Sequence, residues 1–272
     1  MQSILLTVLL VAVIGLVGAI ILTFASRALA VEEDTRVADL VDILPGLNCG
    51  SCGNPGCEGY AKKLLQGAPT NMCQPGGDAV ARQVADYLGV EVQAVTERRA
   101  CVACHGAPDR IRPTEAYDGP KTCRSFATMG HATKSCTYGC IGFGDCAAAC
   151  PFDAIQIGRY GVAGVNHERC TGCGTCVDAC PRGLISLQER GRTNTPFFVY
   201  CKNEGVGKAA KEGCANVCLG CGQCAKACSQ GCITIEGHLA HIDTTRCIGC
   251  QRCVDVCPSG AILALAFSDS RA

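Results

Sequence analysis

The chain has 272 residues, 26 of them cysteine, and its 24 basic and 24 acidic side chains leave no formal net charge. Because the charge is balanced and no basic stripe is present, electrostatics give no support to nucleic-acid binding. The chain has no Trp and only 5% aromatic residues, so it has few large side chains for a core; this favours small modules held together by metal.

Most of the cysteines are closely spaced, with small residues between them. Such C-x-x-C-x-x-C groups favour metal binding over disulfides. Zinc is the alternative, but it usually takes two separated C-x-x-C pairs. Three cysteines three residues apart, followed by a fourth four residues later, fit a 4Fe–4S cluster better. The spacing therefore predicts an iron–sulfur protein that transfers electrons.

Residues 1–26 are predicted to be a membrane anchor. The stretch Ile4–Ala25 is uncharged, almost entirely apolar and long enough to cross a bilayer as a helix. A secretory signal is the alternative, because Ala28-Leu29-Ala30 resembles a cleavage site, but no basic side chain precedes the long apolar stretch. Arg27 follows the span and no Lys or Arg precedes it, which favours a cytoplasmic location for the cluster domains.

Residues 27–90 are expected to form a small domain with one cluster. Val31–Leu44 has the apolar spacing of an amphipathic helix. Glycines and prolines surround three cysteines and let backbone N–H groups turn towards cluster sulfurs. A helix over Glu58–Gln66 then leads to the fourth cysteine. The expected ligands are Cys49, Cys52, Cys57 and Cys73.

Residues 91–130 are expected to be a linker region. In it, Cys101-Val-Ala-Cys104-His105 matches the attachment signal of c-type haem. Covalent haem attachment normally occurs outside the cytoplasm, which conflicts with the predicted location. A sixth metal site using Cys101, Cys104 and Cys123 is a further alternative, and ordinary thiols are the favoured interpretation.

Three other cysteines, Cys201, Cys214 and Cys232, also have no assigned role. One regularity involves two of them and assigns no ligand by itself. The spacing of Cys123, Cys136 and Cys140 recurs in Cys201, Cys214 and Cys218.

Residues 131–192 and 193–272 are predicted to be two tandem ferredoxin-like domains with two clusters each. Each cysteine group leads into a short β-like segment: AIQI, GLISL, CITI and AILAL. In a two-cluster ferredoxin the fourth cysteine of one run ligates the other run's cluster. The expected sets are Cys136, Cys140, Cys146 with Cys180; Cys170, Cys173, Cys176 with Cys150; Cys218, Cys221, Cys224 with Cys257; and Cys247, Cys250, Cys253 with Cys228.

Two of these groups are irregular. Between Cys140 and Cys146, the residues Ile141–Asp145 are expected to bulge, with glycines making the bulge possible. Ser229 stands where proline follows the last cysteine of the other runs, so either the local turn differs or Cys232 replaces Cys228 as ligand. The regular spacing of Cys228 favours it.

Several blocks of the chain resemble the B subunit of the Rnf electron-transport complex. They are VEEDTRVADLVDILPG, LPG-x-NCG-x-CG-x-PGC, NMC-x-PGG, CTYGCIGFGDCAAACPFDAI and CTGCGTCVDACPRGLI. The resemblance covers almost the whole chain and is least clear over Val90–Ala132. It implies an inner-membrane subunit of an ion-translocating ferredoxin:NAD oxidoreductase, with reduced ferredoxin as donor, NAD as eventual acceptor and coupled Na⁺ or H⁺ movement. It also implies membrane and flavin-bearing partner subunits.

No nucleotide fingerprint, carboxylate pair or nucleophile group appears in the sequence, so no catalytic residue is predicted. The expected fold is α+β: a transmembrane helix, a 4Fe–4S module and two ferredoxin-like domains, with about five 4Fe–4S clusters in all. One alternative is a membrane polyferredoxin that serves a hydrogenase or dehydrogenase without ion pumping. Another is an exported redox or haem-binding protein, which requires cleavage after Ala30.

Overall fold

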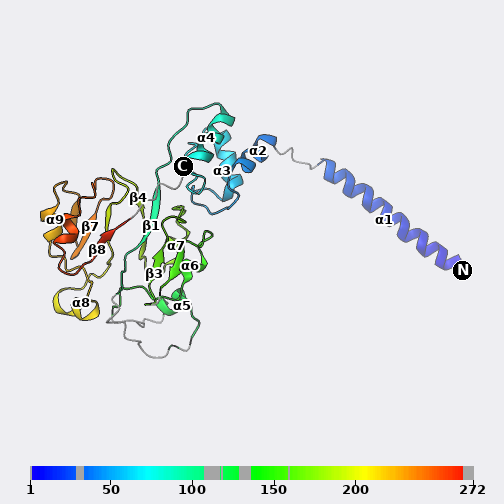
Figure 1. Ribbon diagram of the computed structural model, residues 1–272. Helices are drawn as coiled ribbons and strands as arrows, with labels where there is room; N and C mark the ends of the chain where they lie inside the picture. Colours follow the sequence, from blue (N-terminus) through cyan, green and yellow to red (C-terminus); the bar gives the residue numbers. More distant parts are fainter. Residues whose placement is uncertain are drawn as a thin grey trace.

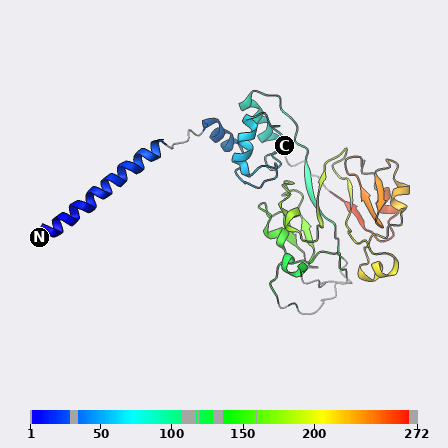
Figure 2. The ribbon, with the colours of Figure 1, turned by 180° about the vertical axis from the view of Figure 1, so that it is seen from behind.

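A computed structural model describes residues 2–28, 34–106, 117, 119–128, 136–158 and 160–265. Helix α1 (Gln2–Ala28) projects away from the rest of the chain (Figures 1 and 2). Its Leu9–Ser26 window has a mean hydropathy of 2.6, and none of it is buried against the chain. Within the described residues it is the one helix with the length and composition to cross a membrane. The sequence that resembles a cleavage site ends at residues 29 and 30, outside the described residues.

Three helices form the module that follows: α2 (Thr35–Ile43), α3 (Gly56–Leu65) and α4 (Gly77–Leu88). Helices α2 and α3 confirm the two helices predicted here, although residues 31–33 lie outside the described part. The apolar faces of the three helices meet in a core that contains Leu40 and Val84, both fully buried.

The next unit contains two antiparallel pairs of strands. Its elements are β1 (Arg98–Val102), α5 (Cys123–Thr128), α6 (Asp145–Ala148), β2 (Ile155–Ile157), β3 (Ala163–Val165), α7 (Thr175–Ala179) and β4 (Ile185–Glu189). Strand β2 pairs with β3, and β1 pairs with β4. The stretch 91–130, expected to be a linker, therefore contributes a strand and a helix to this unit.

The last unit repeats this arrangement. Its elements are β5 (Phe197–Val199), α8 (Gly207–Gly213), α9 (Gln223–Ala227), β6 (Ile233–Glu236), β7 (Leu239–Ile242), α10 (Arg252–Asp255) and β8 (Ile262–Ala264). Strand β6 pairs with β7, and β5 pairs with β8. The four β-like segments of the sequence are confirmed as β2, β4, β6 and β8. Their partners β1, β3, β5 and β7 were not predicted.

The helical module lies beside the first strand unit, and the second strand unit lies against the first (Figures 1 and 2). Each of the three has its own buried core. Hydrogen bonds join the strand units: for example, the Thr244 hydroxyl donates to the Glu189 carbonyl at 3.1 Å, and the His105 N–H donates to the Tyr200 carbonyl at 3.2 Å. Several cysteines belong to the core of each strand unit and Cys73 to that of the helical module, so the fold positions sulfur atoms where other small domains place aliphatic groups.

Candidate iron–sulfur sites

The structure gathers the four cysteines of the helical module. Burial raises the pKa of Cys73 to about 11, and the nearby thiols of Cys57, Cys49 and Cys52 raise it as well. The loop is fixed by side chains: the Asn48 carboxamide oxygen accepts the Cys57 N–H at 2.8 Å. These four thiols are thus neighbours, as their sequence grouping suggested.

Tyr60 holds the chain in place just before Cys73. Its ring is buried, and its hydroxyl donates to the Pro69 carbonyl at 2.7 Å while accepting the Met72 N–H at 3.3 Å. Burial raises the pKa of Tyr60 to about 12. The neutral phenol therefore bridges two backbone groups of the segment that leads to Cys73.

In the first strand unit, Cys150 joins the regular run of Cys170, Cys173 and Cys176. The four line one cavity of about 10 Å³. Burial raises the pKa of Cys176 to about 12, with contributions from the other three thiols and from Cys146 of the adjoining set. The structure thus brings Cys150 to the other run's three cysteines, and the exchange of the fourth ligand between runs stays a prediction.

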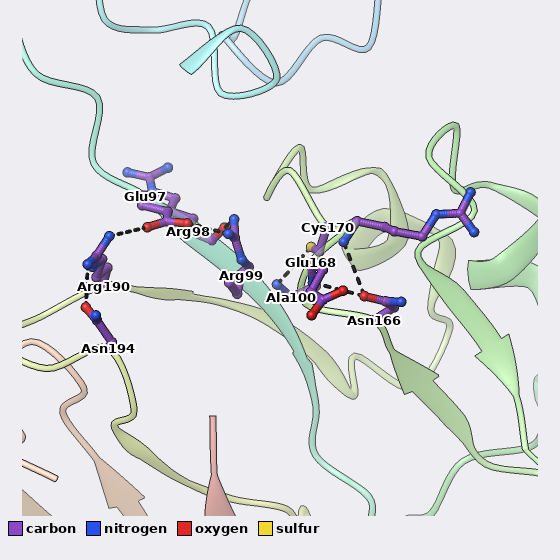
Figure 3. A network of polar contacts seen from close by, with 10 residues as sticks. Glu97, Arg98, Arg99, Ala100, Asn166, Glu168, Cys170, Arg190 and Asn194 are labelled. Atoms are coloured by element: carbon purple, nitrogen blue, oxygen red, sulfur yellow. Dashed lines mark hydrogen bonds and ion pairs between the residues drawn. The ribbon is translucent and has the colours of Figure 1, made fainter. Parts of the chain in front are cut away.

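Strand β1 supports this set from the side (Figure 3). The Ala103 N–H and the Glu97 carbonyl form hydrogen bonds on the side of β1 that faces β4. Because successive residues of a strand point in opposite directions, the Ala100 N–H points away from β4 and donates to Cys170 Sγ at 3.5 Å. Next to it, the fully buried Arg99 forms an ion pair with Glu97. A hydrogen bond and a buried cation beside a thiolate are means of tuning a cluster's reduction potential.

The altered motif of the first strand unit contains no bulge. Gly142 and Gly144 have φ of 93° and 90°, and the corresponding Gly172 and Gly174 of the regular run have 71° and 89°. The loop therefore has the conformation of a regular run, with Phe143 at the position of the middle cysteine. The expected bulge is wrong, because five residues separate Cys140 from Cys146 just as five separate Cys170 from Cys176.

Helix α5 supplies a thiol in place of that middle cysteine. Phe143 packs edge-on against Phe126 of α5 at a ring distance of 5.5 Å. The Asp145 carboxylate accepts the backbone N–H groups of Cys123 and Arg124 at 2.8 and 3.0 Å. These contacts set Cys123 at the cavity that three other cysteines line; with it they are Cys123, Cys140, Cys146 and Cys180.

Cys136 does not share that cavity, although it was grouped with Cys140, Cys146 and Cys180 from the sequence. It lines a separate cavity between the strand units, together with Cys104, Cys201 and Cys214. The sequence offered Cys123 as a candidate ligand but could not decide its role, because Cys123 lies in a stretch with no regular cysteine spacing. The packing of α5 determines which cysteines it joins.

In the second strand unit, one cavity of about 20 Å³ is lined by Cys218, Cys221, Cys224 and Cys257. The other expected set, Cys247, Cys250 and Cys253, adjoins it, since Cys224 lies close enough to add to the raised pKa of Cys253, whose main cause is burial. Its expected fourth ligand, Cys228, is the cysteine that Ser229 follows.

The turn after Cys228 matches those after the other fourth cysteines. In all four turns the N–H of the third following residue donates to the cysteine carbonyl at 3.0–3.3 Å. That third residue has a positive φ each time, at Asp153, Gly183, Gly231 and Gly260. Ser229 therefore leaves the turn unchanged.

Cys232 occupies a core position in this turn. It corresponds to Ala154, Leu184 and Ala261 of the other turns, and all four residues are buried. Burial raises the pKa of Cys228, but the N–H groups of Cys232, Gln230 and Gly231 and the Cys232 thiol outweigh it, so the net pKa is lowered. Cys257 has the same arrangement of three N–H donors and a lowered pKa. This equivalence favours Cys228 over Cys232 as the ligand.

The two thiols of the C-x-x-C-H segment do not face a common site where one haem could attach. Cys101 is 1% exposed and packs with Leu265 and Phe198. Cys104 instead accepts the Cys140 N–H at 3.4 Å. The structure gives the motif two separate environments, one in a core and one at a cavity.

The cysteine sets fit clusters better than single ions. A zinc ion binds each thiolate at about 2.3 Å, so its ligands converge on one point. Over the residues that the structure describes, no three His, Cys, Asp or Glu side chains converge in this way. Instead, four cysteines surround a hollow, as a cubane with one thiolate on each iron requires.

Comparisons with protein families support this chemistry. The model "4Fe-4S dicluster domain" matches residues 136–187 in one form and residues 169–232 and 217–261 in another. The model "Putative Fe-S cluster" matches residues 44–75, the helical module. With its mixed helix and strand fold and its cysteine sets, the chain is a 4Fe–4S protein with several ferredoxin-like domains.

Curated relatives show to which family of 4Fe–4S proteins the chain belongs. The B subunit of the Na⁺-translocating ferredoxin:NAD⁺ oxidoreductase complex of Acetobacterium woodii is 39% identical over 89% of this chain and 72% of its own length. The B subunit of the ion-translocating oxidoreductase complex of Methanosarcina acetivorans is 36% identical over 74% and 75%. The counterpart from the proton-translocating ferredoxin:NAD⁺ oxidoreductase complex of Clostridium ljungdahlii is 35% identical over 79% and 75%. The chain belongs to this family, the B subunits of ion-translocating oxidoreductase complexes, which confirms the resemblance found in the sequence.

Proposed function

We propose that this chain relays electrons from reduced ferredoxin towards NAD within an Rnf-type complex, coupled to translocation of Na⁺ or H⁺. Each 4Fe–4S cluster, when bound, accepts and donates one electron. The chain itself contributes cluster ligation, spacing and the tuning of potential, and the activity is that of the whole complex. The flavin and nicotinamide sites belong to partner subunits.

The observation that carries this proposal is the adjacency of neighbouring cysteine sets. Burial raises the pKa of Cys49 in the helical module, and Cys173 of the first strand unit lies close enough to raise it further. Cys176 and Cys146 are neighbours within the first strand unit, and Cys253 and Cys224 within the second. Adjacent sets allow electrons to pass along the chain.

We assign five clusters to these sets. The proposed ligands are Cys49, Cys52, Cys57 and Cys73; Cys150, Cys170, Cys173 and Cys176; Cys123, Cys140, Cys146 and Cys180; Cys218, Cys221, Cys224 and Cys257; and Cys228, Cys247, Cys250 and Cys253. Cys136, expected from the sequence to complete the third set, is replaced there by Cys123.

Helix α1 anchors the chain in the inner membrane, with the cluster domains on the cytoplasmic side. Soluble ferredoxin reaches these domains there, and other membrane and flavin-bearing subunits complete the complex. Protease added to inverted membrane vesicles is expected to digest the domains while α1 stays protected. Digestion in right-side-out cells instead would contradict this orientation.

The function is tested in inverted vesicles from cells that carry or lack this chain. With the chain, reduced ferredoxin is expected to drive NAD⁺ reduction and uptake of Na⁺ or H⁺; without it, both are lost. A Cys173→Ser variant is expected to lower both, because it disrupts the set nearest the helical module. Co-purification with a hydrogenase or dehydrogenase, and electron transfer without ion uptake, would favour the polyferredoxin alternative.

A further inference from the structure

Four cysteines that the five sets do not use meet where the two strand units join. Cys104, Cys136, Cys201 and Cys214 line one cavity of about 40 Å³. The three cavities lined by ferredoxin-type sets are of the same kind and smaller, at about 20, 20 and 10 Å³, and each of them is also lined by four cysteines. The hollow between the units therefore matches the others in the number of its cysteines and is large enough by the same measure.

The two strand units contribute equivalent positions to this hollow. Cys104 follows β1 by two residues, as Cys201 follows β5. Cys136 precedes Cys140 by four residues, as Cys214 precedes Cys218. The site thus takes the same pair of cysteines from each unit, which accounts for the part of the repeated spacing that Cys136 and Cys140 share with Cys214 and Cys218.

Hydrogen bonds orient these sulfur atoms as they do at the other sets. Cys104 Sγ accepts the Cys140 N–H at 3.4 Å, and Cys201 Sγ accepts the Cys218 N–H at 3.3 Å. Asn203 donates its backbone N–H to Cys201 Sγ at 3.4 Å and its side-chain amide to Cys136 Sγ at 3.7 Å. Donors of this kind stabilise thiolates at iron–sulfur sites, and here one residue of the second unit bonds cysteines from both units.

The charge around the hollow is compensated by cations. Lys202 lines it, and its ammonium donates to the carbonyls of Arg182 and Gly183 at 3.2 and 2.8 Å. The Arg182 guanidinium donates to the Gly139 carbonyl, next to Cys140. Four thiolates and a cluster carry net negative charge, so two nearby cations favour their assembly.

The geometry points to a sixth 4Fe–4S cluster, held between the two strand units by Cys104, Cys136, Cys201 and Cys214. Zinc is the other metal that four thiolates bind, but these side chains do not converge on a single point within the described residues. The site is separate from the five sets, so it does not depend on which electron acceptor or coupling ion the complex uses.

This sixth site joins the two ferredoxin-like units. Its Cys104 accepts a hydrogen bond from Cys140 of the first unit's nearer set, and its Cys201 accepts one from Cys218 of the second unit's nearer set. With it, the cysteine sets run without interruption from the helical module to the C-terminal unit. Through Cys104 and Cys201, which line one cavity, it thus lies beside both Cys140 and Cys218.

The test is metal content of the full chain purified without oxygen. The wild type is expected to hold about 24 irons and as many acid-labile sulfides, four of each for six clusters. Cys104→Ser and Cys201→Ser, one from each unit, are each expected to lose about four irons and four sulfides and the corresponding electron paramagnetic resonance signal. Cys101→Ala, three residues from Cys104 but in a core, is the matched control and should keep the wild-type content.

The wild-type count needs no variant, so the inference stays testable if a variant fails to fold. About 20 irons in the wild type would overturn it. So would one zinc per chain that Cys104→Ser and Cys201→Ser remove, or unchanged iron in both variants. Because metal content is measured on the isolated chain, it is independent of ferredoxin-dependent NAD⁺ reduction.

Discussion

Substituting Cys228 and Cys232 one at a time distinguishes the cluster ligand from the core residue. The two Sγ atoms lie 3.4 Å apart, so either could reach the same iron. Cys228 has the three backbone N–H donors that Cys257 has, whereas burial, followed by contact with Cys228, raises the pKa of Cys232 to about 12. We expect Cys228→Ser to lose about four irons per chain and Cys232→Ala to lose none.

The cost of Cys232→Ala is instead a loss of packing. The side chain is 5% exposed, and the substitution removes a group about the size of one methylene from the core. The lost burial lowers the free energy of unfolding by about 0.8 kcal/mol, and the small cavity left behind lowers it slightly more. Alanine already occupies the equivalent positions 154 and 261, so we expect about 1 kcal/mol in all, measured by urea unfolding with iron content followed in parallel.

Two results would refute this reasoning. If Cys232→Ala loses iron and Cys228→Ser keeps it, the ligand is Cys232. If both single variants keep full iron and only the double variant loses it, the two thiols are interchangeable, and the backbone donors around Cys228 do not select it.

Three further predictions concern individual residues. Cys123→Ser should lose about four irons, and adding Phe143→Cys should restore them, because that position is the middle cysteine of a regular run; failure to restore would contradict the assignment. Tyr60→Phe should lower the unfolding free energy by about 1–3 kcal/mol, because it removes two hydrogen bonds worth about 0.5–1.5 kcal/mol each. Since the pKa of Tyr60 is raised to about 12, its stabilisation is complete below pH 10 and is lost as pH rises towards 12, which a urea series across that range measures. Gly172→Ala should cost about 1–3 kcal/mol, because its Cβ would collide with the Arg98 carbonyl of β1; Gly260→Ala, with a similar φ and open space, should cost less by thermal unfolding.

Local patterns in the sequence were enough to determine the chemistry of this protein. Runs of three cysteines spaced three residues apart, with glycines between them, form a local loop that brings their thiols to one cluster. The apolar stretch of α1 and the β-like segments after each run are likewise local signals. For this reason the regular runs, the helical module's four cysteines and the membrane-compatible helix were all predictable.

Tertiary packing, in contrast, selected which distant cysteines share a site. Cys123 lies 17 residues before Cys140, and it reaches that set because Phe143 and Asp145 dock helix α5 beside it. Strand β1 finds its partner β4 far along the chain, which turns an expected linker into part of a ferredoxin-like unit. Cys136 and Cys201 belong to different units and become neighbours only when those units pack together. Sequence spacing constrains ligands that are close along the chain, whereas contacts between remote segments arise from packing that no local pattern encodes.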